Sequence, residues 1–472
     1  MASILNRIYT ILPVPVQNMV ISAYGYMWRN RRYGGIFNEQ LKEFKEREFY
    51  TLSQWKDFQT SELRKLLVHA IENVPYYRDT FQKAGFNKMT LQSFELEDLL
   101  KLPVLEKETL RKLGTTDLIS EKREKGGEFF TSSGSTGTPV KILFSRSMHQ
   151  KWRAAFEARI YHWAGVTKES SRGMIGGRLV VPGGDEALPP FYRYNYFEKQ
   201  IYFSIYHIRK QNAGDYRDAI KKYKPDFMTG YAASNFLLAS YFDELGFAVE
   251  PLKAVITSSE KLSNAMRETL SKVYQCKVFD SWSGIEACGL ISQHPNGLLY
   301  SSPDVAIIEI LDDQMRPVKK GEMGTMYCTG FMNYDQPLIR YKIGDLAILA
   351  ENQSSEGPQM PVIAEIVGRI DDIVTLKDGR QLSSFNRFFA EIKEVLEVQV
   401  VQTDYEHFTL NIVVSPHYDA KVEKTILDSI AARLGKVNVT INRLDHISRN
   451  ANGKFKAVIS HVGRNSKGAS HA

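Results

Sequence analysis

The sequence predicts an α/β protein with three parts. These are a large N-terminal domain of mixed and parallel sheets, a small β-rich subdomain, and a small C-terminal α+β domain joined through a hinge. Between residues 201 and 280, short apolar runs alternate with helical stretches of about ten residues, which is typical of a parallel sheet. From 305 to 349, β-favouring segments are separated by turns, and beyond 368–372 a compact α+β pattern is long enough for its own core.

Length and composition limit the possible classes. A chain of 472 residues exceeds one ordinary core, and 43% hydrophobic with 24% charged residues is typical of a soluble protein. The net charge of +7 suits an anionic substrate or surface, and no nucleic-acid motif accompanies it, so no nucleic-acid partner is expected. Cys276, Cys288 and Cys328 form no CxxC pair, which predicts reduced thiols, a cytoplasmic location and no zinc site.

Residues 1–36 form an apolar extension that ends in a basic cluster containing Arg29, Arg31 and Arg32. Prolines and polar residues interrupt it, so it does not provide the roughly 20-residue apolar span of a transmembrane helix. The order of its charged and apolar residues also does not fit a signal peptide. Two interpretations remain open: a segment packed on the main domain, or peripheral contact with the inner membrane through residues 1–35.

The elements follow in order from periodicity and breaks. Residues 37–112 are helical in pattern, and Asn73-Val74-Pro75 interrupts them because the residue before a proline avoids the helical region. A helix is predicted over 147–161. The alternating region gives strands 201–205, 227–230, 254–257 and 277–280 and helices 215–223, 234–245 and 264–274. The β-rich part gives strands 305–311, 324–328 and 346–349, which we expect to form a smaller, mostly antiparallel sheet or barrel.

These elements divide the chain into a large ATP- and acyl-binding domain over 37–368, a hinge over 369–372, a lid domain over 373–462 and a disordered tail over 463–472. The lid domain is predicted to contain strands 373–376, 398–402, 408–414 and 437–441 and helices 385–396 and 420–434.

Every residue from 131 to 138 is Ser, Thr or Gly, between two β-favouring runs. Small residues allow main-chain N–H groups to turn toward a polyanion, and hydroxyls add donors, so a phosphate-gripping loop is one interpretation. A flexible linker is the other. The segment is not a Walker A loop, because Pro139 occupies the place of that motif's Gly-Lys-Ser/Thr.

Four further stretches carry candidate chemistry. After a predicted strand, Trp282 can cover a base and Glu286 can hold Mg²⁺, although alone they suit a core residue and a solvated helix residue. Asp345 follows a tight turn and can accept from ribose hydroxyls, or it simply forms the turn. Residues 368–372 fit a charged linker, and Lys454 on its glycine turn would by itself be a surface lysine.

In this order and spacing, the five stretches resemble the adenylate-forming superfamily of acyl-CoA synthetases. The opening loop is similar to its Ser/Thr/Gly phosphate loop, residues 282–286 to its Tyr-Gly-x-x-Glu motif, and residues 341–345 to Tyr-x-x-Gly-Asp. Residues 368–372 resemble its Gly-Arg-x-Asp-Asp hinge, and 452–454 its C-terminal Gly-Lys. Residues 67–78 resemble the phenylacetate–CoA ligase branch, and the chain is most similar to that branch's capsular-polysaccharide-associated members. The sequence departs from the family pattern at two places. Trp282-Ser283 stands where the family has Tyr-Gly, and residues 376–383 follow the family pattern only loosely.

The resemblance implies attack of a carboxylate on the α-phosphate of ATP, with Mg²⁺ as cofactor and CoA or a sugar amine as the acyl acceptor. Phosphate binding is implied for Thr131, Ser132, Ser133, Gly134, Ser135, Thr136, Gly137 and Lys141. Adenine and ribose binding is implied for Ser259, Glu260, Asp280, Trp282, Ser283, Asp345 and Arg369. Glu286 would hold Mg²⁺, Asp371 would be the hinge residue, and Lys454 would stabilise charge in the chemical step.

The small carboxylic acid itself is not identified by the sequence. Aromatic and apolar residues between 161 and 231, including His162, Tyr206 and Tyr231, are candidates for its pocket, and each is equally suited to a core. The alternative function is a non-catalytic relative that binds within a polysaccharide-assembly complex. The joint presence of Glu286, Asp345, Arg369 and Lys454 favours the enzyme.

Overall fold

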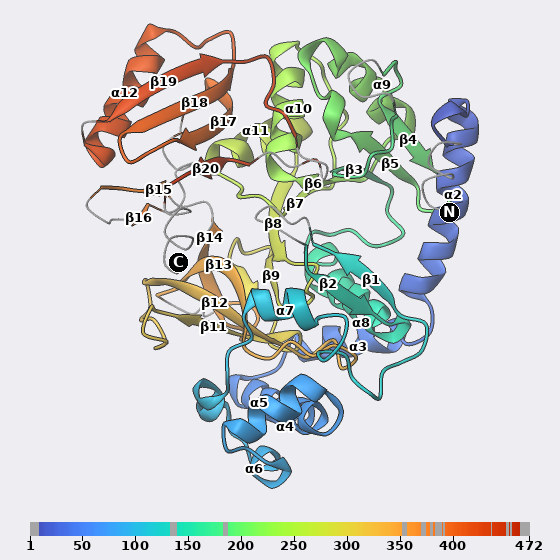
Figure 1. The fold of residues 1–472 in the computed structure, drawn as a ribbon. Coiled ribbons are helices and arrows are strands. Elements are labelled where there is room, and N and C mark those ends of the chain that lie inside the picture. Colours follow the sequence, from blue (N-terminus) through green and yellow to red (C-terminus); the bar gives the residue numbers. More distant parts are fainter. Residues whose placement is uncertain are drawn as a thin grey trace. The chain divides into compact units, whose positions relative to one another are not determined.

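The computed structural model has a mixed α/β fold, as predicted (Figure 1). It describes residues 9–132, 139–182, 187–351, 356–369, 374–377, 381–382, 389, 392–435, 437–449, 453 and 456–462. The chain divides into two compact units. The first comprises Met1–Gly25, Glu169–Val278 and Val367–Ala472, and the second comprises Tyr26–Lys168 and Phe279–Ile366.

The first unit is built on parallel strands. They are β3 (Arg172–Gly176), β5 (Gln200–Ser204), β6 (Phe227–Tyr231) and β7 (Ala254–Ser258), with β4 (Tyr192–Asn195) antiparallel to β5 at the edge. The order is β7-β6-β3-β5-β4. Their residues are almost all buried, as expected for parallel strands covered by helices.

Three helices accompany these strands: α9 (Ala213–Tyr223), α10 (Ala232–Glu244) and α11 (Asn264–Tyr274). Tyr216 of α9, Phe242 of α10 and Leu270 of α11 lie in one apolar core with Ile175 and Val255 of the sheet. Helix α10 is buried on nearly all sides, which agrees with its uniformly apolar sequence.

The C-terminal part of the first unit is a four-stranded sheet with the order β19-β18-β17-β20. Its members are β17 (Val395–Gln402), β18 (His407–Val414), β19 (Asn438–Arg443) and β20 (Val458–Ser460), together with helix α12 (Ala420–Leu434) (Figure 1). Ile426 and Ile430 of α12 pack with Val400, Leu410 and Ile412 of the sheet, so this part has a core of its own. Two short strands precede it, β15 (Val374–Thr375) and β16 (Gln381–Leu382).

The second unit begins with helices. They are α3 (Phe37–Arg47), α4 (Leu52–Asn73), α5 (Pro75–Lys83), α6 (Lys88–Gln92), the 3₁₀ helix η1 (Leu96–Lys101) and α7 (Lys107–Leu113). Thr51 caps α4 through its side chain, and the side chain of Gln54 returns a bond to the backbone N–H of Thr51. The predicted break at Pro75 is confirmed, because α4 ends at Asn73 and α5 begins at Pro75.

The remaining strands of the second unit are mostly antiparallel. A hairpin of β1 (Glu128–Thr131) and β2 (Lys141–Phe144) is followed by helix α8 (Arg146–Phe156), which continues as a π-helical turn at Glu157–Tyr161. The other strands run in the order β11-β12-β13-β14-β10-β9-β8. They are β8 (Lys277–Ser283), β9 (Leu290–Gln293), β10 (Leu299–Ser301), β11 (Ala306–Leu311), β12 (Met323–Gly330), β13 (Tyr341–Leu349) and β14 (Val362–Arg369). The predicted β-rich part is therefore an open sheet and not a barrel.

The alternating elements from 200 to 283 lie where the sequence predicts them. Strands β3, β4, β9, β10 and β14 were not predicted. The predicted helix over 385–396 is wrong at its end, because β17 begins at Val395 and pairs with β18. Residues 370–372 of the predicted hinge over 369–372, and the tail over 463–472, lie outside the described residues. Among the helices that the structure describes, none is both long and apolar enough to cross a membrane.

The close contact between β3 and β6 leads to a first prediction. Gly230 has φ +127°, and a Cβ at that position would lie 1.8 Å from the carbonyl oxygen of Ile175 on β3. Gly230→Ala therefore combines backbone strain with a clash, and we expect it to cost at least about 3 kcal/mol of stability. The control is Gly214→Ala in α9, where a Cβ meets nothing within 4 Å. Thermal unfolding should show a lower midpoint for Gly230→Ala alone. Equal midpoints for the two variants would contradict the close strand contact.

Candidate functional site

The predicted phosphate loop is the tip of a β-hairpin. Strands β1 (Glu128–Thr131) and β2 (Lys141–Phe144) are antiparallel, with Thr131 opposite Lys141. The N–H of Ser132 donates to the carbonyl of Val140 at 3.0 Å, and the N–H of Val140 donates to the hydroxyl of Ser132 at 3.1 Å. Thr131 and Lys141 are exposed at the mouth of the hairpin. The predicted ligands Ser133, Gly134, Ser135, Thr136 and Gly137 lie outside the described residues.

A buried amide holds the base of this hairpin. The side chain of Gln336 accepts from the N–H of Leu143 at 2.6 Å and donates to the carbonyls of Lys141 and Gly114, at 3.1 and 2.8 Å. Asn333 donates to the carbonyl of Leu143 at 2.9 Å, and its oxygen accepts from the N–H of Gln336. Both side chains are buried, so water does not replace these bonds. The sequence analysis missed Asn333 and Gln336, and their only signal is two amides on either side of Asp335, between short apolar runs.

An aromatic cluster lies beneath the hairpin. The ring of Phe130 lies 4.9 Å from that of Phe144 and 5.7 Å from those of His149 and Trp28. Burial is the largest cause of a low pKa at His149, and the positive charge of Arg32 is the next. Together they lower the pKa of His149 to about 3, so its ring is neutral at pH 7.

One arginine joins this cluster to the hairpin backbone. Arg31 donates to the carbonyl of Phe144 at 2.9 Å and lies 3.6 Å from the carboxylate of Glu128. It therefore touches both strands of the hairpin from helix α2 (Val14–Tyr33).

The segment after β8 places a carboxylate against the backbone. The N–H of Ala287 donates to the carbonyl of Gly284, which closes a tight turn. Glu286 is buried in this turn, and a Cβ on Gly284 would lie 2.4 Å from its carboxylate oxygen. Because Gly284 has no side chain, the carboxylate of Glu286 can lie close to its backbone. Ser283 itself is half-buried at the end of β8.

Trp282 and Asp280 lie on β8 itself. The half-buried Trp282 ring covers Gly289, where a Cβ would lie 2.8 Å from the ring. One carboxylate oxygen of Asp280 accepts from the N–H of Ser281 at 3.0 Å.

Asp345 lies in an irregularity of β13. Leu346 faces Thr325 and Lys342 faces Tyr327, so three residues of β13 face Met326 alone. Gly344 has φ +89°, a conformation that glycine adopts at low cost. Bulges of this kind turn a side chain away from its regular direction, and here Asp345 is left half-buried.

Three of the predicted nucleotide ligands belong to the first unit. Ser259 is exposed with φ +68° after β7. A carboxylate oxygen of Glu260 accepts from the N–H of Ala233 at 3.0 Å, in the first turn of α10, where the helix dipole favours a negative charge. Arg369 is half-buried at the end of β14. The hinge residue Asp371 and the predicted catalytic Lys454 lie outside the described residues.

The residue before Lys454 is described, and its position is informative. Gly453 is buried with φ +75°, and a Cβ there would lie 2.8 Å from the Cα of Gly177 and from a methyl group of Ile205. The hydroxyl of Tyr206 donates to the carbonyl of the same Gly177 at 3.4 Å. The C-terminal glycine turn therefore lies against the segment that follows β3.

The candidate pocket residues differ in their surroundings. Burial, and then the carboxylate of Glu260, raise the pKa of Tyr231 to about 12, so its phenol is neutral at pH 7. Tyr231 also shares a hydrogen bond with the backbone of Gly177. His162 is exposed and belongs to the second unit, whereas Tyr206 and Tyr231 belong to the first.

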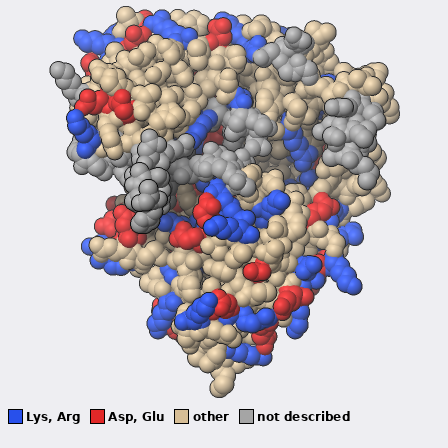
Figure 2. Space-filling view, viewed as in Figure 1, with Lys and Arg blue, Asp and Glu red and all other residues tan. Residues whose placement is uncertain are grey.

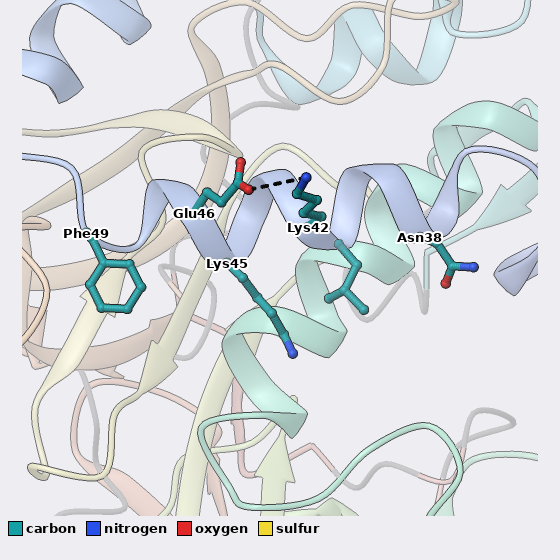
Figure 3. A pocket seen from close by; sticks show the side chains of 6 residues that line it. Asn38, Lys42, Lys45, Glu46 and Phe49 are labelled. Carbon is teal, nitrogen blue, oxygen red and sulfur yellow. Dashed lines mark ion pairs between the residues drawn. The ribbon is translucent and has the colours of Figure 1, made fainter.

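An open hollow of about 530 Å³ lies along α3, far along the sequence from every predicted ligand (Figure 3). Its lining includes Lys42 and Glu46, which form an ion pair of 3.8 Å, and the exposed Phe49. It contains no residue of the predicted site. Among the described residues, no group of three or more His, Cys, Asp or Glu could hold a metal ion.

Comparison with known proteins identifies the relatives of this chain. The CapK C-terminal domain family matches residues 375–461. Protein CapK of Staphylococcus aureus is 24% identical over 97% of this chain and 100% of its own length. The phenylacetate-coenzyme A ligase of Escherichia coli K12 is 23% identical over 82% of this chain and 84% of its own. The chain is homologous to CapK and to the phenylacetate-coenzyme A ligases.

A solved structure supports the fold. The 2-hydroxyisobutyryl-CoA ligase in its postadenylation state, in complex with R3-HIB-AMP, gives a TM-score of 0.69 at 20% identity, covering 88% of this chain and 91% of that one. The fold is therefore that of the adenylate-forming CoA ligases, as the motifs predicted. The roles of the individual site residues stay predictions.

The hydrogen bonds between Gln336 and the hairpin lead to a second prediction. Gln336→Met leaves the N–H of Leu143 and the carbonyls of Lys141 and Gly114 without this partner. We expect the free energy of unfolding to fall by about 2–4 kcal/mol and the amide hydrogens of residues 128–144 to exchange faster. Gln59→Met is the control, because Gln59 is half-buried and donates to the carbonyl of Pro303 at 3.1 Å. Hydrogen-exchange mass spectrometry measures both. Unchanged protection of the hairpin in Gln336→Met would contradict its role as the anchor.

Proposed function

We propose that this protein uses ATP to convert a small carboxylic acid into an acyl-adenylate, with release of pyrophosphate. The proposal rests mainly on the close contact of Gly453 with Gly177 and Ile205. Gly453 precedes Lys454 in the sequence, and Tyr206 and Tyr231 bond to the backbone of the same Gly177. Homology to the phenylacetate-coenzyme A ligases supports the same reaction class.

The residues of the second unit suit a nucleotide and its metal. The exposed mouth of the hairpin, at Thr131, Ser132 and Lys141, offers hydroxyls and a cation for the β- and γ-phosphates. Glu286 would hold Mg²⁺, which prefers one or two carboxylates and completes its shell with phosphate oxygens and water. The metal would neutralise charge on the phosphates.

Binding of the base and the sugar is assigned to other residues. Trp282 has the flat ring needed to cover adenine, and its position over Gly289 fixes the ring plane. Asp345 and Arg369 would hold the ribose hydroxyls. We assign Ser259, Glu260, Asp280 and Ser283 to the outer part of the same nucleotide site.

In the reaction, a carboxylate oxygen of the acid attacks the α-phosphorus. The bond from that phosphorus to the oxygen bridging the β-phosphate breaks, and pyrophosphate leaves with the electron pair. Lys454 would stabilise the charge that develops on the α-phosphate oxygens, and the hairpin would hold the leaving group. Rotation about the hinge at Asp371 would then allow the second step.

The acid would lie near Gly177, beside the neutral phenols of Tyr206 and Tyr231. We propose CoA as the acceptor, because the homologous ligases carry CoA in their names. A sugar amine is the other acceptor, and it would connect the protein to polysaccharide biosynthesis. Assays with each acceptor distinguish these two second steps.

The chemical role of Lys454 makes a third prediction. Lys454→Ala should lower carboxylate-dependent pyrophosphate release by about 10²–10³ and leave ATP affinity largely unchanged, because one preorganised donor is lost. The matched control is Lys456→Ala, two residues away, whose backbone carbonyl accepts from Gln399 and whose side chain has no assigned role.

Pyrophosphate release is measured over a panel of small aromatic and aliphatic acids, each with CoA, with a sugar amine or with neither. Equal rates in Lys454→Ala and the parent protein would overturn the assignment of Lys454. If the parent protein releases no pyrophosphate with any acid, the binding-component alternative is favoured instead.

A further inference from the structure

Helix α2 (Val14–Tyr33) lies on the body of the protein with its polar side inward. Gln17, Asn18, Ser22 and Gly25 are its buried residues. Asn18 accepts from the N–H of Tyr194 at 2.9 Å, and Ser22 accepts from the N–H of Tyr196 at 3.0 Å.

These two N–H groups lie on β4 and just beyond its end, where β4 is the edge strand of the parallel sheet. At Gly25 a Cβ would lie 2.1 Å from the side chain of Asn195, so the helix approaches this edge closely. Polar side chains of α2 thus accept hydrogen bonds from backbone N–H groups at the open edge of the sheet. This explains why the polar side of the helix is the buried one.

The outward side of α2 is consequently apolar. The exposed fractions are 59% for Met19, 49% for Tyr24 and 69% for Met27, and Val20 is exposed between them. Val20, Tyr24 and Met27 lie opposite Asn18, Ser22 and Gly25 on the helix, and Met19 lies on its flank. We call Met19, Val20, Tyr24 and Met27 the outward face of α2.

Further apolar side chains follow the edge strand. Tyr196 and Phe197 are both exposed, and Tyr196 is joined to α2 through the bond from its N–H to Ser22. Exposed apolar side chains grouped in this way are typical of a surface that binds a partner.

The segment that carries this face has charge of one sign. Residues 1–38 contain four arginines, Arg7, Arg29, Arg31 and Arg32, and no Asp or Glu. Arg31 is occupied by Glu128 and the hairpin backbone, and Arg29 and Arg32 are partly exposed cations in the last turns of α2. On the face drawn in Figure 2, Lys and Arg are interspersed with Asp and Glu. An outward apolar face on a segment that has arginines and no acidic residue of its own is complementary to an anionic, partly apolar surface.

A second copy of the chain fits this face less well. A two-fold dimer through α2 would bring the arginines of one copy toward those of the other, with no acidic residue in the segment to pair with them. An anionic lipid surface supplies both the negative charge and the apolar depth. Because no described helix is suited to cross a membrane, α2 would lie in the plane of the headgroups.

We propose that the outward face of α2 docks this protein on an anionic membrane surface, with Met19, Val20, Tyr24 and Met27 inserted at the boundary between headgroups and acyl chains. Aromatic and long apolar side chains are favoured at this depth, and Arg29 and Arg32 would remain at the level of the phosphates. The inference does not depend on the proposed enzymatic reaction.

The test uses the full chain and vesicles of phosphatidylcholine with or without phosphatidylglycerol. We expect co-sedimentation with the anionic vesicles to be at least about tenfold stronger than with the neutral ones, and to weaken as salt is added. The triple variant Val20→Ser, Tyr24→Ser, Met27→Gln should lose at least about tenfold in binding. These side chains point away from the body, so its thermal midpoint should stay near that of the parent protein.

The matched control is Phe49→Ser with Met89→Gln, because Phe49, in the turn after α3, and Met89, in α6, are exposed apolar residues outside α2. It should bind vesicles as the parent protein does. Absence of binding to anionic vesicles, or equal binding by the triple variant, would overturn the proposal. A parent dimer in sedimentation velocity that the triple variant converts to monomer would also overturn it, in favour of a second copy as the occupant.

Discussion

The buried amide of Gln336 is the contact on which the second unit's candidate site depends. Strands β1 and β2 have four residues each, and a two-stranded hairpin of that length is marginal on its own. Gln336 lies 193 residues after Leu143 in the chain and binds β2 through both its oxygen and its nitrogen. The same nitrogen donates to Gly114, at the end of α7, so one side chain fixes the hairpin, the end of a helix and the segment that leads into β13.

The same segment connects the hairpin with a second candidate residue. The loop before β13 carries Asn333 and Gln336, and the strand that follows carries Asp345 in its bulge. A short segment with several buried hydrogen bonds can therefore set both the base of the hairpin and the position of a carboxylate.

The sequence could predict what depends on local pattern. Strands β5 to β8 and helices α9 to α11 follow from periodicity, and the break at Pro75 follows from the geometry of proline. Strands β3 and β4 were missed because Arg172, Gly173 and Gly176 in one, and Tyr192, Arg193 and Asn195 in the other, give no apolar run. Gln336 and Asn333 were missed because a hydrogen bond to a backbone group about 190 residues away leaves no trace in local sequence. The inward polar side of α2 was hidden for the same reason: its partner is the open edge of β4.

The backbone of Gly453 packs directly against the segment that follows β3. Gly453 has a backbone conformation that other residues rarely adopt, and a Cβ there would lie 2.8 Å from the Cα of Gly177. A larger residue at Gly453 would push the turn away from Gly177 and Ile205, and the residue that follows is Lys454. The glycine of the Gly-Lys pair therefore matters for its lack of a side chain. A motif that looks like an ordinary surface turn in the sequence is, in the folded chain, a contact between the C-terminal part and the end of β3.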